Sequence, residues 1–63
     1  MCESDVYLYD EERGEVLLLE KVDKIVPKED ELFMENIFGE RKTLKARIKE
    51  MTLVDHRIVL EKI

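Results

Sequence analysis

Hydrophobic and polar residues follow one another in short runs along the chain, and polar turns separate these runs. The first run, Val6-Tyr7-Leu8-Tyr9, is rich in aromatic and β-branched residues, which predicts a strand over residues 4–10. The polar stretch Glu11-Glu12-Arg13-Gly14 follows it and predicts a hairpin turn, in which Gly14 is free to take a positive φ. The chain therefore opens with a strand and a turn typical of antiparallel sheets.

The second apolar run, Val16-Leu17-Leu18-Leu19, is continuous rather than alternating. It predicts a strand over residues 15–22 that is covered on both faces, and in a chain this short we expect the second cover to be another subunit. Leucine, glutamate and lysine also suit a helix, but the β-branched residues that follow favour a strand. A further short strand is expected within residues 23–28, where Pro27 marks a strand end or an edge.

Residues 31–37 alternate, so that one face of a third region is apolar except for an asparagine; this face consists of Leu32, Met34 and Asn36. The next residues, Phe38-Gly39-Glu40, predict a turn in which Gly39 takes a positive φ. We expect Phe38, a large apolar residue beside this turn, to plug one end of the folded domain.

Residues 41–48 alternate again, with Leu44, Ala46 and Ile48 on the apolar face. The parity changes afterwards without a turn, which predicts a β-bulge or a single helical turn at Lys49-Glu50. Asp55-His56-Arg57 then predicts a final hairpin, with Ile58 and Leu60 facing the core. Six or seven short strands in this one chain predict a single all-β domain over residues 1–63, folded as a small antiparallel barrel.

The size of the chain sets a limit on its stability. A domain of 63 residues buries only about 60% of the surface that its unfolded chain exposes, and such chains usually need disulfides, metals or self-association. A single cysteine excludes an intrachain disulfide, which leaves a metal or a second subunit. The net charge of −5 argues against unspecific binding to nucleic acid. There is no basic leader and no apolar stretch of membrane-spanning length, and with the unpaired thiol this predicts a cytoplasmic location.

The lone thiol belongs to Cys2 and has close nitrogen neighbours. The α-amine of Met1, the backbone nitrogen of Cys2 and its Sγ can close two fused five-membered chelate rings, a donor set that suits nickel(II) or copper(II). Glu3, Ser4, water or the Cys2 of a second chain would complete the site. Removal of Met1 in the cell would leave a single ring. The alternative is an incidental thiol, because one cysteine is not a metal-site motif.

Other candidate chemistry is sparse. His56, the only histidine, could be a ligand or a base, but its place in a predicted turn beside Asp55 favours a turn or solvent role unless folding brings it near Cys2. Ser4 is the only serine and lacks a nucleophile elbow, and no phosphate-binding loop is present. The carboxylates are scattered along predicted strands and turns. These observations indicate a protein that is not an enzyme.

Two further hypotheses remain open. Tyr7 and Tyr9 could stack on bases beside the basic segment formed by Arg41, Lys42, Lys45, Arg47 and Lys49, as in a small nucleic-acid-binding barrel. Alternatively, the domain only dimerises, and Cys2 forms a disulfide between subunits.

Three stretches resemble the CooT family of small cytoplasmic nickel-binding proteins. They are Met1-Cys2-Glu3-Ser4-Asp5-Val6-Tyr7-Leu8, Asn36-Ile37-Phe38-Gly39-Glu40 and Ile58-Val59-Leu60. The resemblance implies an SH3-like barrel, a homodimer, and nickel(II) bound through Cys2 by an accessory protein of carbon monoxide dehydrogenase. The combined hypothesis is a dimeric metallochaperone that pairs through the aliphatic second strand and holds Ni²⁺ with Cys2 and Met1 for a recipient nickel enzyme.

Overall fold

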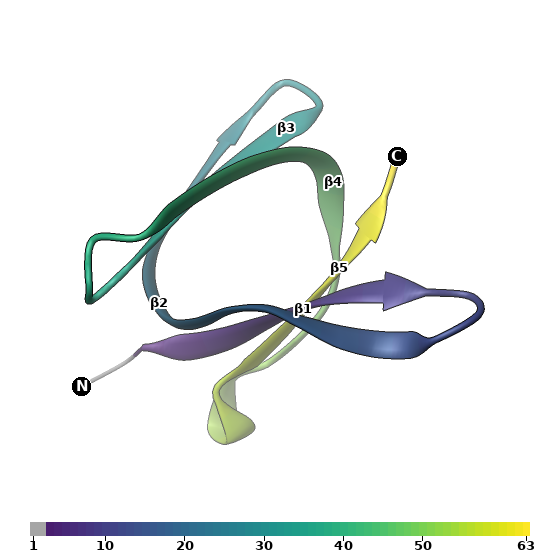
Figure 1. The fold of residues 1–63 in the computed structure, drawn as a ribbon, viewed down its shortest axis with the longest axis horizontal. Helices are drawn as coiled ribbons and strands as arrows, with labels where there is room; N and C mark the ends of the chain where they lie inside the picture. The colour runs from purple at the N-terminus through teal and green to yellow at the C-terminus, as the bar shows by residue number, and fades with distance from the viewer. Residues whose placement is uncertain (1–2) are drawn as a thin grey trace.

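The computed structural model describes residues 3–63, which form a closed ring of strands (Figure 1). The strands are β1 (Ser4–Asp10), β2 (Gly14–Lys28), β3 (Glu31–Asn36), β4 (Arg41–Thr52) and β5 (Arg57–Lys62), and one turn of 3₁₀ helix, η1 (Leu53–Asp55), precedes the last. Consecutive strands pair antiparallel, and β1 closes the ring by pairing parallel with β5. The predicted all-β, SH3-like small barrel is confirmed, with five strands among the described residues instead of six or seven.

The strand count is lower because two predicted strands are halves of one. β2 is continuous over 15 residues; its first part pairs with β1 and its second part with β3. Register shifts on both sides of Val22, together with a positive φ of 53° at Lys21, bend the strand where it changes partner. Bulges increase local twist, so a single strand can turn the corner of a barrel.

β4 bends in the same way. Its first residues pair with β3 and the rest with β5, and a register shift between Ile48 and Glu50 confirms the predicted bulge. The predicted final hairpin is confirmed, since β4 and β5 pair antiparallel, and its loop is the 3₁₀ turn η1, which ends at His56 in the left-handed conformation (φ 55°). The change from β4 to β5 therefore takes place through a helical turn, with Arg57 already in β5.

The two glycine turns are confirmed, since Gly14 and Gly39 both take positive φ, 78° and 85°. Asp10 helps to form the first turn, because its Oδ1 accepts hydrogen bonds from the backbone N–H of Glu12 at 2.8 Å and of Arg13 at 3.3 Å. These bonds favour the ionised carboxylate and lower the pKa of Asp10.

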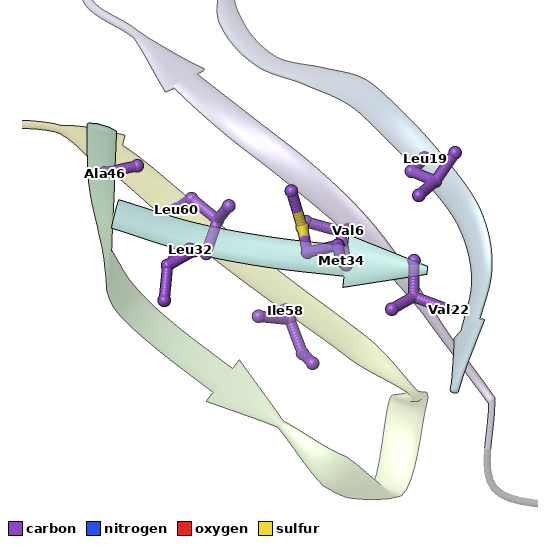
Figure 2. Close-up of a cluster of buried hydrophobic side chains, with 8 residues drawn as sticks. All are labelled: Val6, Leu19, Val22, Leu32, Met34, Ala46, Ile58 and Leu60. Atoms are coloured by element: carbon purple, nitrogen blue, oxygen red, sulfur yellow. The ribbon is translucent and has the colours of Figure 1, made fainter. Parts of the chain in front are cut away.

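The core lies inside the ring, where alternate residues of all five strands meet. Figure 2 shows eight side chains gathered there: Val6, Leu19, Val22, Leu32, Met34, Ala46, Ile58 and Leu60. Met34, Leu60 and Val6 are fully buried. The inward face predicted for β3 is confirmed, and so are the inward positions of Ile58 and Leu60.

Two apolar residues are not where the hydrophobic pattern predicted them. Phe38 does not plug the barrel; 62% of its surface is exposed at the turn between β3 and β4. The buried Asn36 side chain lies beneath that turn, and its Oδ1 accepts hydrogen bonds from the N–H groups of Phe38 (3.1 Å) and Glu40 (2.9 Å). Ile48, next to the β4 bulge, is also exposed. In both places the local backbone, rather than the apolar character of the residue, decides the direction of the side chain.

Candidate functional site

The predicted metal donors, Met1 and Cys2, lie outside residues 3–63, which the structure describes. The candidate site is therefore defined by the place where β1 begins. Ser4, the first residue of that strand, is buried and pairs with Val22 of β2. The residues that contact this strand end form the surface at which the chain enters the barrel.

Three hydrogen bonds connect four segments around the start of β1. The N–H of Asp5 donates to the carbonyl of His56 at 2.9 Å, and the N–H of Lys21 donates to Oδ1 of Asp5 at 3.1 Å. The N–H of Ile37 then donates to the carbonyl of Lys21 at 3.0 Å. We call these four segments, residues 3–5, 21–22, 36–40 and 53–56, the amino-terminal rim. The rim is held by bonds between strands that are far apart in the sequence.

Each of the two turns in the rim is fixed by bonds of its own. Asn36 makes the β3–β4 turn rigid, because its Nδ2 donates to Oε1 of Glu40 at 2.7 Å in addition to the two bonds that its Oδ1 accepts. At η1 the N–H of His56 donates to the carbonyl of Leu53 at 3.2 Å. Sequence reasoning missed the role of Lys21, whose left-handed conformation gives no signal in a residue type that rarely adopts it.

The rim combines exposed apolar side chains with carboxylates. Its exposed apolar residues stand at the two turns: Ile37 and Phe38 on the β3–β4 turn, Leu53 and Val54 on η1. Its carboxylates are those of Glu3, Asp5, Glu40 and Asp55. Within the four described segments the only lysine or arginine is Lys21. The rim is therefore both apolar at its tips and negatively charged.

Residues 3–63 contain no group of three or more histidine, cysteine, aspartate or glutamate side chains placed to hold a metal ion. His56 does come to the start of β1, since its carbonyl accepts the hydrogen bond of Asp5, and its side chain is exposed. The condition set for a ligand role, a position near Cys2, lies outside the described residues. The described residues supply single donors, so a complete metal site needs the terminal thiol and amine or a second molecule.

The residues considered for nucleic-acid binding are largely engaged with one another. The guanidinium of Arg57 lies 4.6 Å from the centre of the Tyr7 ring, and the ammonium of Lys49 lies 5.1 Å from that of Tyr9. Arg57 also donates a hydrogen bond to Glu15, and this bond, with a second one to Tyr7, raises the pKa of Arg57.

The basic segment of β4 is divided in the same way. Arg41 pairs with Glu35 at 3.2 Å on the β3 side, and Arg47 pairs with Glu61 at 2.8 Å on the β5 side. Two cations of the segment are thus paired with carboxylates of the neighbouring strands, so the segment is not a surface of free cations. The structure brings Tyr7 together with Arg57, and Tyr9 together with Lys49 of the segment.

Comparisons with known proteins give a consistent result. The family model described as "CO dehydrogenase accessory protein CooT" matches residues 1–61. A crystal structure described under the CooT name, from Carboxydothermus hydrogenoformans, is 50% identical in sequence, superposes with a TM-score of 0.90, and each chain covers 98% of the other. No curated protein matches. Within residues 3–63 no helix has the length and apolar character needed to cross a membrane.

Proposed function

This chain belongs to the CooT family of CO dehydrogenase accessory proteins, and from that premise we propose that it serves maturation of the enzyme by carrying nickel(II) on the Cys2 thiolate. Nickel is the cargo in this proposal, and the protein performs no catalysis of its own. The unpaired thiol suits a reducing compartment, so we propose that it acts in the cytoplasm.

The observation that supports the proposal best is the hydrogen-bonded rim around the start of β1. Two residues of chain reach at most about 7 Å, so Cys2 cannot leave the neighbourhood of Ser4. Ser4 itself is buried and paired in the sheet, and Asp5 is bonded to both neighbouring strands. The barrel therefore serves as a fixed base for the only thiol in the chain.

The donor chemistry also fits a carrier. The Cys2 thiolate, with nitrogen from the Met1 amine and the backbone, offers the soft and nitrogen ligands that nickel(II) accepts. The scarcity of further ligands among residues 3–63 favours an open site. An open site releases its metal by ligand exchange more readily than a closed site with four protein ligands.

Replacing Cys2 by serine tests the metal claim. In a titration with nickel, Cys2→Ser should lose the thiolate-to-nickel absorption band and bind at least about tenfold more weakly, because a thiolate is the active metal ligand. His56→Ala is the matched control for a nearby donor, and we expect it to retain the band. Equal nickel binding by Cys2→Ser and the unchanged protein would contradict the proposal.

We further propose that the protein is a homodimer that pairs through the outer face of β2. Leu17 is 52% exposed there, and Tyr7 lies opposite it in the sheet. Charge does not oppose self-pairing at this face, because Arg57 and Glu15 neutralise each other beside it. An isologous contact of this kind would supply the second cover that the continuous apolar run requires.

Leu17→Glu is expected to convert the dimer into a monomer, because two carboxylates would face each other in an apolar contact. Sedimentation equilibrium of the two proteins at several concentrations measures this change. Ile63→Glu, at an exposed apolar residue at the end of β5, should leave the mass unchanged. A monomeric starting protein, or a dimeric Leu17→Glu variant, would show that this face is not the interface.

A further inference from the structure

We propose that the amino-terminal rim is the surface through which this protein docks on the enzyme that receives its nickel. The partner surface that fits it has apolar pockets bordered by lysine or arginine side chains. This inference rests on the proposed nickel carrier function and adds to it the surface and chemistry of the encounter. It follows from the exposed tips, the charge and the rigidity of the rim.

The two apolar tips are spaced as anchors of one contact. Three hydrogen bonds in series, through Asp5 and Lys21, connect the end of η1 to Ile37, so both tips lie at one edge of the ring. The whole barrel measures 31 × 25 × 16 Å, so one protein–protein interface can cover both tips. Val54 is 88% exposed, and Phe38 is the most exposed aromatic residue of the described chain. A few side chains buried at the centre of an interface supply most of its binding energy, and aromatic residues such as Phe38 are common there.

The two apolar tips stand on backbone that hydrogen bonds hold in place. Asn36 fixes the turn that carries Phe38, and the hydrogen bond from Asp5 to His56 ties the end of η1 to β1. A contact residue on a rigid turn loses little conformational freedom when it binds, so more of its burial energy appears as affinity. The exposed phenylalanine, leucine and valine on these turns do not belong to the core cluster. The stability of the barrel therefore does not explain them.

The charge of the rim decides between a partner and a second copy of this chain. Four carboxylates surround the tips, with Lys21 as the counter-charge. In a two-fold dimer the same surface faces itself, so these carboxylates would be set against one another. Like charges opposed in an interface cost free energy, whereas a cationic border on the partner attracts them and speeds association. The rim therefore suits a partner of opposite charge, and the β2 face suits self-pairing.

Docking at the rim would also enclose the metal. Cys2 is within about 7 Å of Ser4, which lies between the two tips in the order of the ring. A partner that covers both tips would then cover the thiolate as well. Its own ligands could replace those of the carrier one at a time, away from bulk water.

Binding of the nickel-free CO dehydrogenase to the immobilised accessory protein tests this inference. Phe38→Glu and Val54→Glu should each weaken binding at least tenfold, while Ile63→Glu should bind as the unchanged protein does. Binding of the unchanged protein should also fall as salt is raised. Unchanged binding by both rim variants, or no binding by the unchanged protein, would overturn the inference. Circular dichroism of each variant, with Phe38→Ser as a milder replacement, separates loss of contact from loss of fold.

Two measurements on the same variants separate this inference from the proposed function. If Phe38→Glu and Val54→Glu bind nickel normally and fail to dock, the inference holds. If they dock normally while Cys2→Ser loses nickel, the carrier proposal survives and the docking surface is wrong. If the rim variants change from dimer to monomer in sedimentation, the rim is an interface between copies of this chain and the inference is overturned.

Discussion

Leu60→Ala is expected to remove a large share of the free energy of unfolding of the barrel. Leu60 is fully buried in β5, where it pairs with Leu8 of β1 on one side and with Ile48 of β4 on the other. Removing a buried leucine to the β-carbon costs about 2–5 kcal/mol, since the lost contacts leave a cavity. At about 0.05–0.15 kcal/mol per residue, a domain of this length has only about 3–9 kcal/mol in total.

Thermal unfolding followed by circular dichroism measures the effect of Leu60→Ala. A loss of about 3 kcal/mol corresponds to a fall in Tm on the order of 15 °C for a domain of this size. Leu53→Ala is the matched control, because it makes the same chemical change at an exposed residue of η1 and should shift the free energy of unfolding by less than about 0.5 kcal/mol. Similar Tm values for the two variants would show that the core described here does not hold the barrel together.

Asn36→Ala is expected to have the second-largest effect, about 2–3 kcal/mol. The substitution removes three hydrogen bonds at once and leaves the N–H groups of Phe38 and Glu40 without their acceptor. Each hydrogen bond contributes about 1 kcal/mol, and an unsatisfied, partly buried donor costs about as much again. The turn between β3 and β4 should loosen, and with it the bond from Ile37 to Lys21.

Urea unfolding and amide hydrogen exchange together test the role of Asn36. Exchange should accelerate first at Phe38, Glu40 and Ile37. Glu40→Gln is the control, since the amide oxygen of glutamine can still accept the bond from Nδ2 of Asn36, and only a small loss is expected. If Glu40→Gln destabilises the barrel as much as Asn36→Ala, the charge of Glu40 rather than the amide network is what matters.

Local patterns in the sequence predicted the local structure well. The bounds of β1, the inward face of β3, the two glycine turns and the bulge in β4 are all confirmed, because each depends on neighbouring residues alone. The merging of two predicted strands into β2 was not foreseen. Its bend is made by Lys21, a residue whose type gives no reason to expect a positive φ, and it is held by partners from two other strands, β1 and β3.

Phe38 illustrates the limit of hydrophobicity as a guide. A large apolar residue beside a turn predicted burial, but the asparagine two positions earlier fills the space beneath the turn and directs the phenylalanine outward. The metal chemistry of Cys2 could be read from the sequence, since it depends on atoms of one terminus, and nickel binding there stays a prediction. The rim could not be predicted from the sequence, because closure of the ring brings together residues up to about fifty positions apart.

The parallel pair of β1 and β5 joins the first strand of the chain to the last. On the ribosome, synthesis at about 5–20 residues per second takes several seconds for a chain of this length, and β5 is made at the very end. β1 can therefore pair with β2 early in translation, but it cannot pair with β5 until the other four strands have been made. In the proposed function, the fixed base that the barrel gives to Cys2 is complete only once β5 has paired with β1.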